Sequence, residues 1–236
     1  MKNDLFSIGP FTVHGYGLMI AIGVLSAYYM VEYRAKKKQM DWEKVFPLTV
    51  WSVLGGFLGS KILYLLTRLP DILANPALLG SSIKDGFVVY GGIIGGILTA
   101  WIYCKCTKWN FWEIFDIAMP AVAMAQGFGR IGCLLAGCCY GIELDPANPI
   151  GIVFHNSAYA PNDVALLPTQ IISSVLDFAN CFVLLALSKK LKTDGQVASC
   201  YLIFYSIGRF VLEYFRGDLI RGNVGEFSTS QFISLF

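Results

Sequence analysis

Long apolar segments, separated by short charged connections, run through most of the sequence. Six of them have roughly the 20 mostly apolar residues that a helix needs to cross a bilayer. They cover residues 14–33, 45–67, 87–104, 113–137, 168–188 and 197–215. The pattern predicts an all-α fold, a polytopic bundle of six transmembrane helices in a single domain over residues 1–236. An apolar run begins again at STSQFISLF, so we expect a seventh span to be missing at the C-terminus.

The composition supports a membrane protein. Hydrophobic residues make up 56% of the chain and charged residues only 14%, against roughly 25% charged residues in soluble domains. No Lys/Arg-rich tract is interleaved with aromatic residues, so we expect no nucleic-acid partner. The seven cysteines lack the usual metal-ligand spacing and come with only two histidines, so we expect no zinc site.

The distribution of basic residues predicts the orientation of the spans. Connections on one side of the predicted membrane, at 34–44, 105–108 and 189–192, hold 10 of the 18 Lys and Arg residues. Basic connections stay on the cytoplasmic side of a membrane. We therefore expect the N-terminus outside, and the longer loops 68–86 and 138–167 outside as well.

Three basic residues fall inside the predicted spans, Lys61, Arg130 and Arg209, and the acidic Glu213 lies near them in the last span. A charge at the centre of a bilayer costs about 2.5–3.5 kcal/mol on insertion scales, so such groups usually have a function. The predicted orientation places all four toward the outer face, which indicates one polar cavity there. A guanidinium matches a phosphate through two parallel hydrogen bonds, so Arg130 is a candidate for binding a phospholipid head group. The alternative is a structural ion pair between Arg130 and Glu213.

Glycines and cysteines near these charges leave two interpretations open. Small residues allow close helix packing, and they also expose the backbone to a ligand; both interpretations apply to the glycines near Tyr90 and Arg130. Cys133, Cys138 and Cys139 either form a redox pair or pack as small polarizable side chains.

Several motifs resemble those of the prolipoprotein diacylglyceryl transferase family. GRIGCLLAGCCYG (129–141) is similar to its signature Gly-Arg-x-Gly-Asn-Phe-x-Asn-x-Glu-x-x-Gly, and GRFVLEYFRGD (208–218) resembles its late Arg-x-x-x-Glu-x-x-Arg element. HGYGLMIAIG (14–23), DGFVVYGGIIGG (85–96) and LPTQ (167–170) resemble elements of other spans. The resemblance covers nearly the whole chain.

This sequence departs from the family pattern at several positions that are polar in the family. Tyr90 stands where the family has histidine, Cys133 and Ala136 where the signature has asparagines, and Cys138 where it has glutamate. The charges that suit a phosphate are kept, while several polar groups around them are replaced. The chain therefore resembles a divergent branch of the family.

The resemblance implies a transferase of the bacterial cytoplasmic (inner) membrane, with its cavity toward the outer face. Such an enzyme moves a diacylglyceryl group from phosphatidylglycerol to the thiol of a lipobox cysteine in a prolipoprotein, so its partners are phosphatidylglycerol, the lipobox peptide and membrane lipids. The resemblance also implies no metal and no cofactor. The implied catalytic residues are Tyr90 and Arg209. The implied substrate-binding residues are Arg130, Tyr16, Gly91, Gly92, Gly129, Gln170 and Glu213. The alternatives are a lipid-binding protein without this chemistry and a membrane thiol-disulfide protein.

Overall fold

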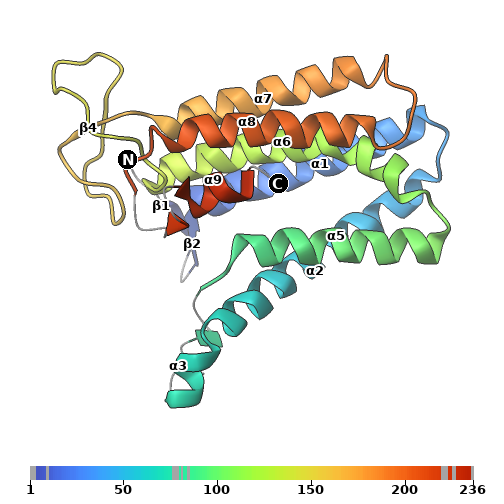
Figure 1. Cartoon of the computed structure of the whole chain (residues 1–236), viewed down its shortest axis with the longest axis horizontal. Helices are drawn as coiled ribbons and strands as arrows, with labels where there is room; N and C mark the ends of the chain where they lie inside the picture. The colour runs from blue at the N-terminus through green and yellow to red at the C-terminus, as the bar shows by residue number, and fades with distance from the viewer. Residues whose placement is uncertain are drawn as a thin grey trace. The chain divides into compact units, whose positions relative to one another are not determined.

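A computed structural model describes residues 4–8, 11–75, 80, 82–83, 86–218, 223–224 and 227–234. The chain folds as two compact units (Figure 1). The first unit combines Met1–Val31 with Phe115–Phe236, and the second is Glu32–Ile114. The single domain over residues 1–236 stays a prediction.

Each of the six predicted spans is a helix in the structure. They are α1 (Gly15–Lys37), α2 (Val45–Thr67), α5 (Val89–Thr107), α6 (Phe111–Ala136), α7 (Thr169–Leu187) and α8 (Gln196–Glu213). Within the described residues, five helices are long and apolar enough to cross a membrane. Of the six long helices, α8 does not belong to this group, because Arg209 and Glu213 lower its mean hydropathy. The structure thus supports a polytopic helical membrane protein, while the count of six spans stays a prediction.

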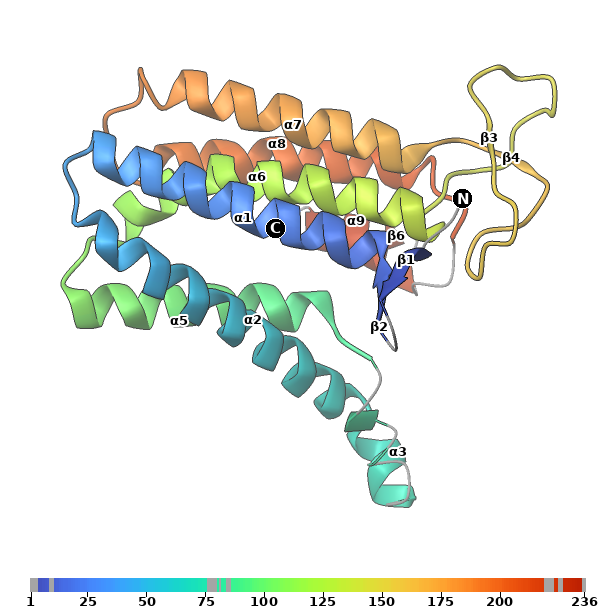
Figure 2. The ribbon, with the colours of Figure 1, turned by 180° about the vertical axis from the view of Figure 1, so that it is seen from behind.

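Helices α1, α6, α7 and α8 run side by side in the first unit (Figures 1 and 2). Apolar side chains of α6, α7 and α8 form its core, including Met119, Cys181 and Leu184. The buried Asp116 of α6 holds the start of α8, because its carboxylate accepts hydrogen bonds from the backbone N–H groups of Gly195 (2.9 Å) and Ala198 (2.8 Å). A carboxylate suits this place, since the N-terminus of a helix carries partial positive charge and free N–H donors.

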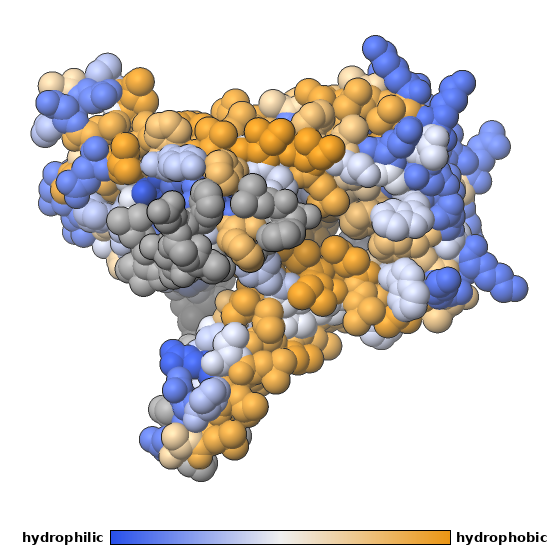
Figure 3. Space-filling model, viewed as in Figure 1, coloured by the Kyte–Doolittle hydropathy of each residue, from blue (hydrophilic) through white to orange (hydrophobic). Residues whose placement is uncertain are grey.

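The outward faces of α7 and α8 are apolar. Hydrophobic side chains cover both helices between hydrophilic ends (Figure 3). Phe182 of α7 is 69% exposed and Ile207 of α8 is 59% exposed. A soluble protein rarely exposes a continuous apolar surface of this kind, so these faces fit contact with lipid.

Short strands and helices occupy the connections. Three antiparallel hairpins pair β1 (Asp4–Ile8) with β2 (Phe11–His14), β3 (Ile152–Val153) with β4 (Ala165–Leu166), and β5 (Asn223–Val224) with β6 (Phe227–Ser228). The short helices are η1 (Trp42–Lys44), α3 (Leu69–Ala74) and α9 (Thr229–Ser234). The all-α prediction did not include the hairpins, because they lie outside the apolar runs on which it rested.

In the second unit, α2 and α5 pack through glycines. A Cβ added at Gly91 would collide with the carbonyl oxygen of Gly59, and one at Gly95 with that of Gly55. Helix packing therefore accounts for these glycines. The side chain of Lys61 also acts within this unit, because its Nζ donates hydrogen bonds to the carbonyl oxygens of Ser82 (3.1 Å) and Gly86 (3.0 Å).

We expect Gly91→Ala to lower the stability of the protein in detergent by about 1–3 kcal/mol, the usual range for overpacking. The reason is that the backbone of Gly59 cannot yield to the new methyl group as a flexible side chain would. Thermal unfolding measures the effect. Gly17→Ala is the matched control, since a Cβ there meets nothing within 4 Å. Equal stability of the two variants would contradict the packing role.

Candidate functional site

A cavity of about 290 Å³ lies between α6, α7 and α8 of the first unit. Polar and charged side chains line part of it, and apolar side chains line the rest. The polar members are Arg130, Ser173, Asp177, Asn180, Tyr205 and Arg209, and the apolar members include Leu176, Val183, Phe204 and Leu212. The structure thus brings together Arg130 and Arg209, two residues that the sequence predicted to share one site.

Arg130 presents its guanidinium to this cavity. Its nearest acidic partner is Asp177, at 3.9 Å between Nε and Oδ2, and 23% of the arginine side chain is exposed. In the part of the chain that the structure describes, nothing accepts a hydrogen bond from this guanidinium. A guanidinium has five N–H donors, so Arg130 can offer two parallel hydrogen bonds to an anionic ligand.

Arg209 is held by neighbours on α8 and α9. Its Nη2 lies 2.8 Å from Oε2 of Glu213, one turn along the helix, and donates a hydrogen bond to Oγ of Ser230 at 2.8 Å. Oε1 of Glu213 accepts a hydrogen bond from Oγ of Ser228 at 2.8 Å. Glu213 therefore pairs with Arg209. The alternative of a structural Arg130–Glu213 pair is wrong, because the acidic residue beside Arg130 is Asp177.

Four polar residues of this cavity, Ser173, Asp177, Asn180 and Tyr205, escaped the sequence analysis. Asp177 and Asn180 lie one turn apart on α7 and both line the cavity. The Asn180 side-chain oxygen is buried and has no hydrogen-bond partner within the described residues. A buried acceptor without a partner is costly, and a donor on a bound ligand would satisfy it. The sequence did carry a signal for Asp177, because an acidic residue in the middle of the fifth apolar segment is unusual.

Gln170, Gly129 and Tyr16 lie elsewhere in the first unit. Gln170 is 1% exposed, and its Nε2 donates a hydrogen bond to the carbonyl oxygen of Cys138 at 2.8 Å. Tyr16 packs against Gly132, and a Cβ at Gly129 would lie 3.7 Å from Ile20. These three residues do not line the cavity, and their substrate-binding roles stay predictions.

Tyr90, Gly91 and Gly92 belong to the second unit. Tyr90 is 39% exposed in the first turn of α5. Gly91 is buried against α2. The structure gives Gly91 a packing role. The catalytic role of Tyr90 and the substrate-binding roles of the two glycines stay predictions.

A third arginine, Arg216, follows the end of α8 and is buried. It donates hydrogen bonds from Nε and Nη2 to the two carboxylate oxygens of Asp218, at 2.8 and 2.7 Å. Burial alone would lower the pKa of Arg216, but these hydrogen bonds and the neighbouring Cys139 side chain raise it above its ordinary value. Arg216 is therefore a fixed positive charge beside Cys139.

The exposed residues of the cavity lining are apolar. Leu176 of α7 is 45% exposed and Phe204 of α8 is 40% exposed, on the faces of these helices that fit contact with lipid. The cavity thus combines exposed apolar side chains with two guanidinium groups. The arrangement thus suits an amphiphile with an anionic head.

Comparison with known proteins agrees with this chemistry. The sequence model of a family described as prolipoprotein diacylglyceryl transferase matches residues 3–236. A Clostridium tetani protein named phosphatidylglycerol–prolipoprotein diacylglyceryl transferase is 46% identical, over 100% of this chain and 93% of its own length. A Clostridium perfringens protein of that name, with the number 2, is also 46% identical, over 100% and 91%. A Staphylococcus carnosus protein of that name is 32% identical, over 90% and 78%. The chain therefore belongs to the prolipoprotein diacylglyceryl transferase family.

Proposed function

We propose that this protein transfers the diacylglyceryl group of phosphatidylglycerol to the thiol of a lipobox cysteine in a prolipoprotein. The names of its relatives state both substrates. The observation that carries the proposal is the Arg130 guanidinium, which has no hydrogen-bond acceptor among the described residues and faces a cavity shared with Arg209. A phospholipid phosphate supplies the acceptor oxygens that this group lacks.

The reaction balances without a cofactor. The thiol sulfur of the acceptor cysteine attacks the terminal carbon of the diacylglyceryl group, and a carbon–sulfur bond forms. The bond between that carbon and the phosphate oxygen breaks, and glycerol phosphate leaves with the electron pair. The proton of the thiol passes to a base or to the leaving phosphate. Transfer therefore needs a thiol with thiolate character and stabilisation of charge on the leaving phosphate.

The two arginines of the cavity stabilise the charge on the leaving phosphate. Arg130 binds the phosphate, and Arg209 stabilises the charge that grows on it as the bond breaks. Both act in a partly buried site, where charge–charge interactions are stronger than in water. Glu213 and Ser230 position the Arg209 guanidinium, and Asp177 lies beside that of Arg130.

The remaining polar groups have narrower roles in the proposal. Asn180 accepts a hydrogen bond from a hydroxyl of the glycerol head group, which satisfies its buried oxygen. Tyr90 donates a hydrogen bond to the thiol or the phosphate. Tyr16, Gly91, Gly92, Gly129 and Gln170 support substrate binding, as the family resemblance implies.

Six spans and an outward N-terminus complete the proposal. The cavity then opens toward the outer face of the bacterial cytoplasmic membrane, where secreted prolipoproteins emerge. The basic connections after α1, α5 and α7 support this orientation, because basic connections remain in the cytoplasm.

Complementation tests the proposed function. We expect the gene to restore lipidated lipoprotein in a strain depleted of its own diacylglyceryl transferase. Arg68→Ala is the matched control for Arg130→Ala. Arg68 is an exposed arginine that pairs with Asp71 in the second unit, so this variant should complement like the parent. A well-expressed protein that binds phosphatidylglycerol vesicles but yields no lipidated lipoprotein would contradict transfer and favour a binding protein.

A further inference from the structure

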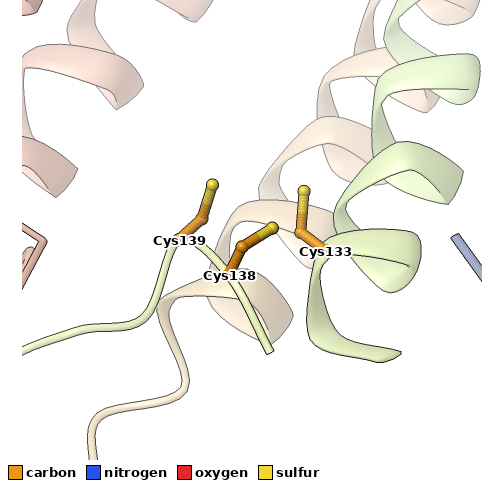
Figure 4. A group of neighbouring side chains, drawn as sticks. All are labelled: Cys133, Cys138 and Cys139. Atoms are coloured by element: carbon orange, nitrogen blue, oxygen red, sulfur yellow. The ribbon is translucent and has the colours of Figure 1, made fainter. Parts of the chain in front are cut away.

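Three cysteines converge at the end of α6. Cys133 lies in the last turn of the helix, and Cys138 and Cys139 lie in the loop that follows. Their three sulfur atoms all lie within 4.8 Å of one another. Figure 4 shows the sulfurs on the same side of the loop, with that of Cys138 directed toward Cys133. The proposed transfer uses none of these thiols, so the cluster needs an explanation of its own.

The backbone at the end of α6 explains why cysteines that are several residues apart in the sequence have neighbouring sulfur atoms. The N–H of Cys138 donates to the carbonyl oxygen of Cys133 at 3.1 Å, and that of Gly137 to Leu134 at 3.2 Å. This hydrogen-bond pair is the Schellman motif, which brings the residue after the terminal glycine beside the last turn of the helix. Gly137 has the required positive φ of 75°, and a Cβ there would collide with Oγ of Ser157.

The start of α7 fixes the loop that carries the other two thiols. The hydroxyl of Thr169 donates a hydrogen bond to the carbonyl oxygen of Cys139 at 2.8 Å, and Nε2 of Gln170 donates to that of Cys138 at 2.8 Å. Cys139 itself has a positive φ of 60°, an uncommon conformation for a residue other than glycine. The backbone thus holds the three sulfurs close together.

We propose that Cys133, Cys138 and Cys139 form a binding site for one thiophilic metal ion of the Cu(I) type. Thiolate sulfur is the donor that such soft ions select. In the described part of the chain no histidine, aspartate or glutamate joins the group, so the site offers three sulfurs, which favours a three-coordinate ion. This inference goes beyond the proposed transfer and does not rest on it.

The geometry and the local charge fit such an ion. With metal–sulfur bonds of about 2.3 Å, three sulfurs around one ion lie about 4 Å apart. The observed sulfurs, all within 4.8 Å, need only small shifts to reach that spacing. Binding releases the thiol protons to solvent, and three thiolates around a monovalent ion leave a net negative charge. The buried Arg216, beside Cys139, compensates part of this charge.

Metal titration of the purified, fully reduced protein in detergent tests the site. Cd(II) is the spectroscopic probe, because its thiolate complexes absorb in the ultraviolet, and Cu(I) affinity follows from competition with a chromogenic chelator. We expect one Cd(II) per chain and a sulfur-to-cadmium band. Loss of one ligand in Cys138→Ser should weaken Cu(I) binding at least about 100-fold, above the usual effect of losing an outer-shell partner.

Two controls keep the result decisive. Cys106→Ser removes an exposed thiol outside the cluster and should bind both ions like the parent. Thermal unfolding without metal shows whether Cys138→Ser still folds, and Cu(I) should raise the Tm of the parent more than that of this variant. The proposal is wrong if the reduced parent gives no band, or if Cys138→Ser and Cys106→Ser bind Cu(I) equally well.

Discussion

Arg130→Ala should reduce kcat/KM for diacylglyceryl transfer by about 100- to 1,000-fold, the usual cost of removing one group that stabilises a developing anion. The guanidinium lines the cavity with no acceptor among the described residues, so its interactions are reserved for the substrate. Arg130→Lys should recover only part of the loss, because an ammonium keeps the charge but cannot form two parallel hydrogen bonds. Transfer to a lipobox peptide by purified variants measures both effects.

One control separates substrate binding from stability. Arg130→Ala also leaves the mostly buried carboxylate of Asp177 without its nearest cation, and an unpaired buried charge destabilises a fold. The double variant Arg130→Ala/Asp177→Asn removes that charge. It should unfold at a temperature closer to the parent's and still transfer as slowly as Arg130→Ala. Recovery of transfer in the double variant would show that Arg130 acts only as a structural partner of Asp177.

Arg209→Ala should cost a similar factor, about 100-fold or more in kcat, and Glu213→Gln about tenfold. Arg209 lines the cavity, whereas Glu213 contacts Arg209 and Ser228 and does not line it. The smaller effect is expected because Ser230 still holds the Arg209 guanidinium when the carboxylate is gone. Single-turnover kinetics, which isolate the chemical step, measure both losses.

Non-additivity identifies Glu213 as a positioning residue. If it acts through Arg209, Glu213→Gln should have no further effect on kcat in the Arg209→Ala background, since residues that work as a unit do not add. Independent, additive losses from the two single changes would show that Glu213 contacts the substrate itself.

The helices were predictable because the membrane constrains them so strongly. A span must be apolar over its whole length, so predicted segments such as 45–67 match α2 closely. The positions of Arg130 and Arg209 in one cavity followed from the cost of burying a charge in a bilayer. The hairpins were not predictable in this way, because short connections carry no comparable periodic signal.

Partners that meet through tertiary structure were harder to predict. Asp177 lies 47 residues after Arg130 in the chain, and only the packing of α7 against α6 brings them together. The thiol cluster had a local signal that simple spacing rules overlook. Cys133, Gly137 and Cys138 match a helix that ends in a Schellman turn, and that turn brings the first and last of them side by side.

The most direct test of the proposed transfer is the fate of both halves of the lipid. The purified protein is incubated with phosphatidylglycerol labelled in its head group and with a lipobox peptide. We expect the peptide to gain the mass of one diacylglyceryl group while an equal amount of labelled glycerol phosphate is released, and a peptide with serine in place of the cysteine should gain nothing. Release of labelled glycerol phosphate without any gain in peptide mass would contradict transfer, because it would make the protein a lipid hydrolase.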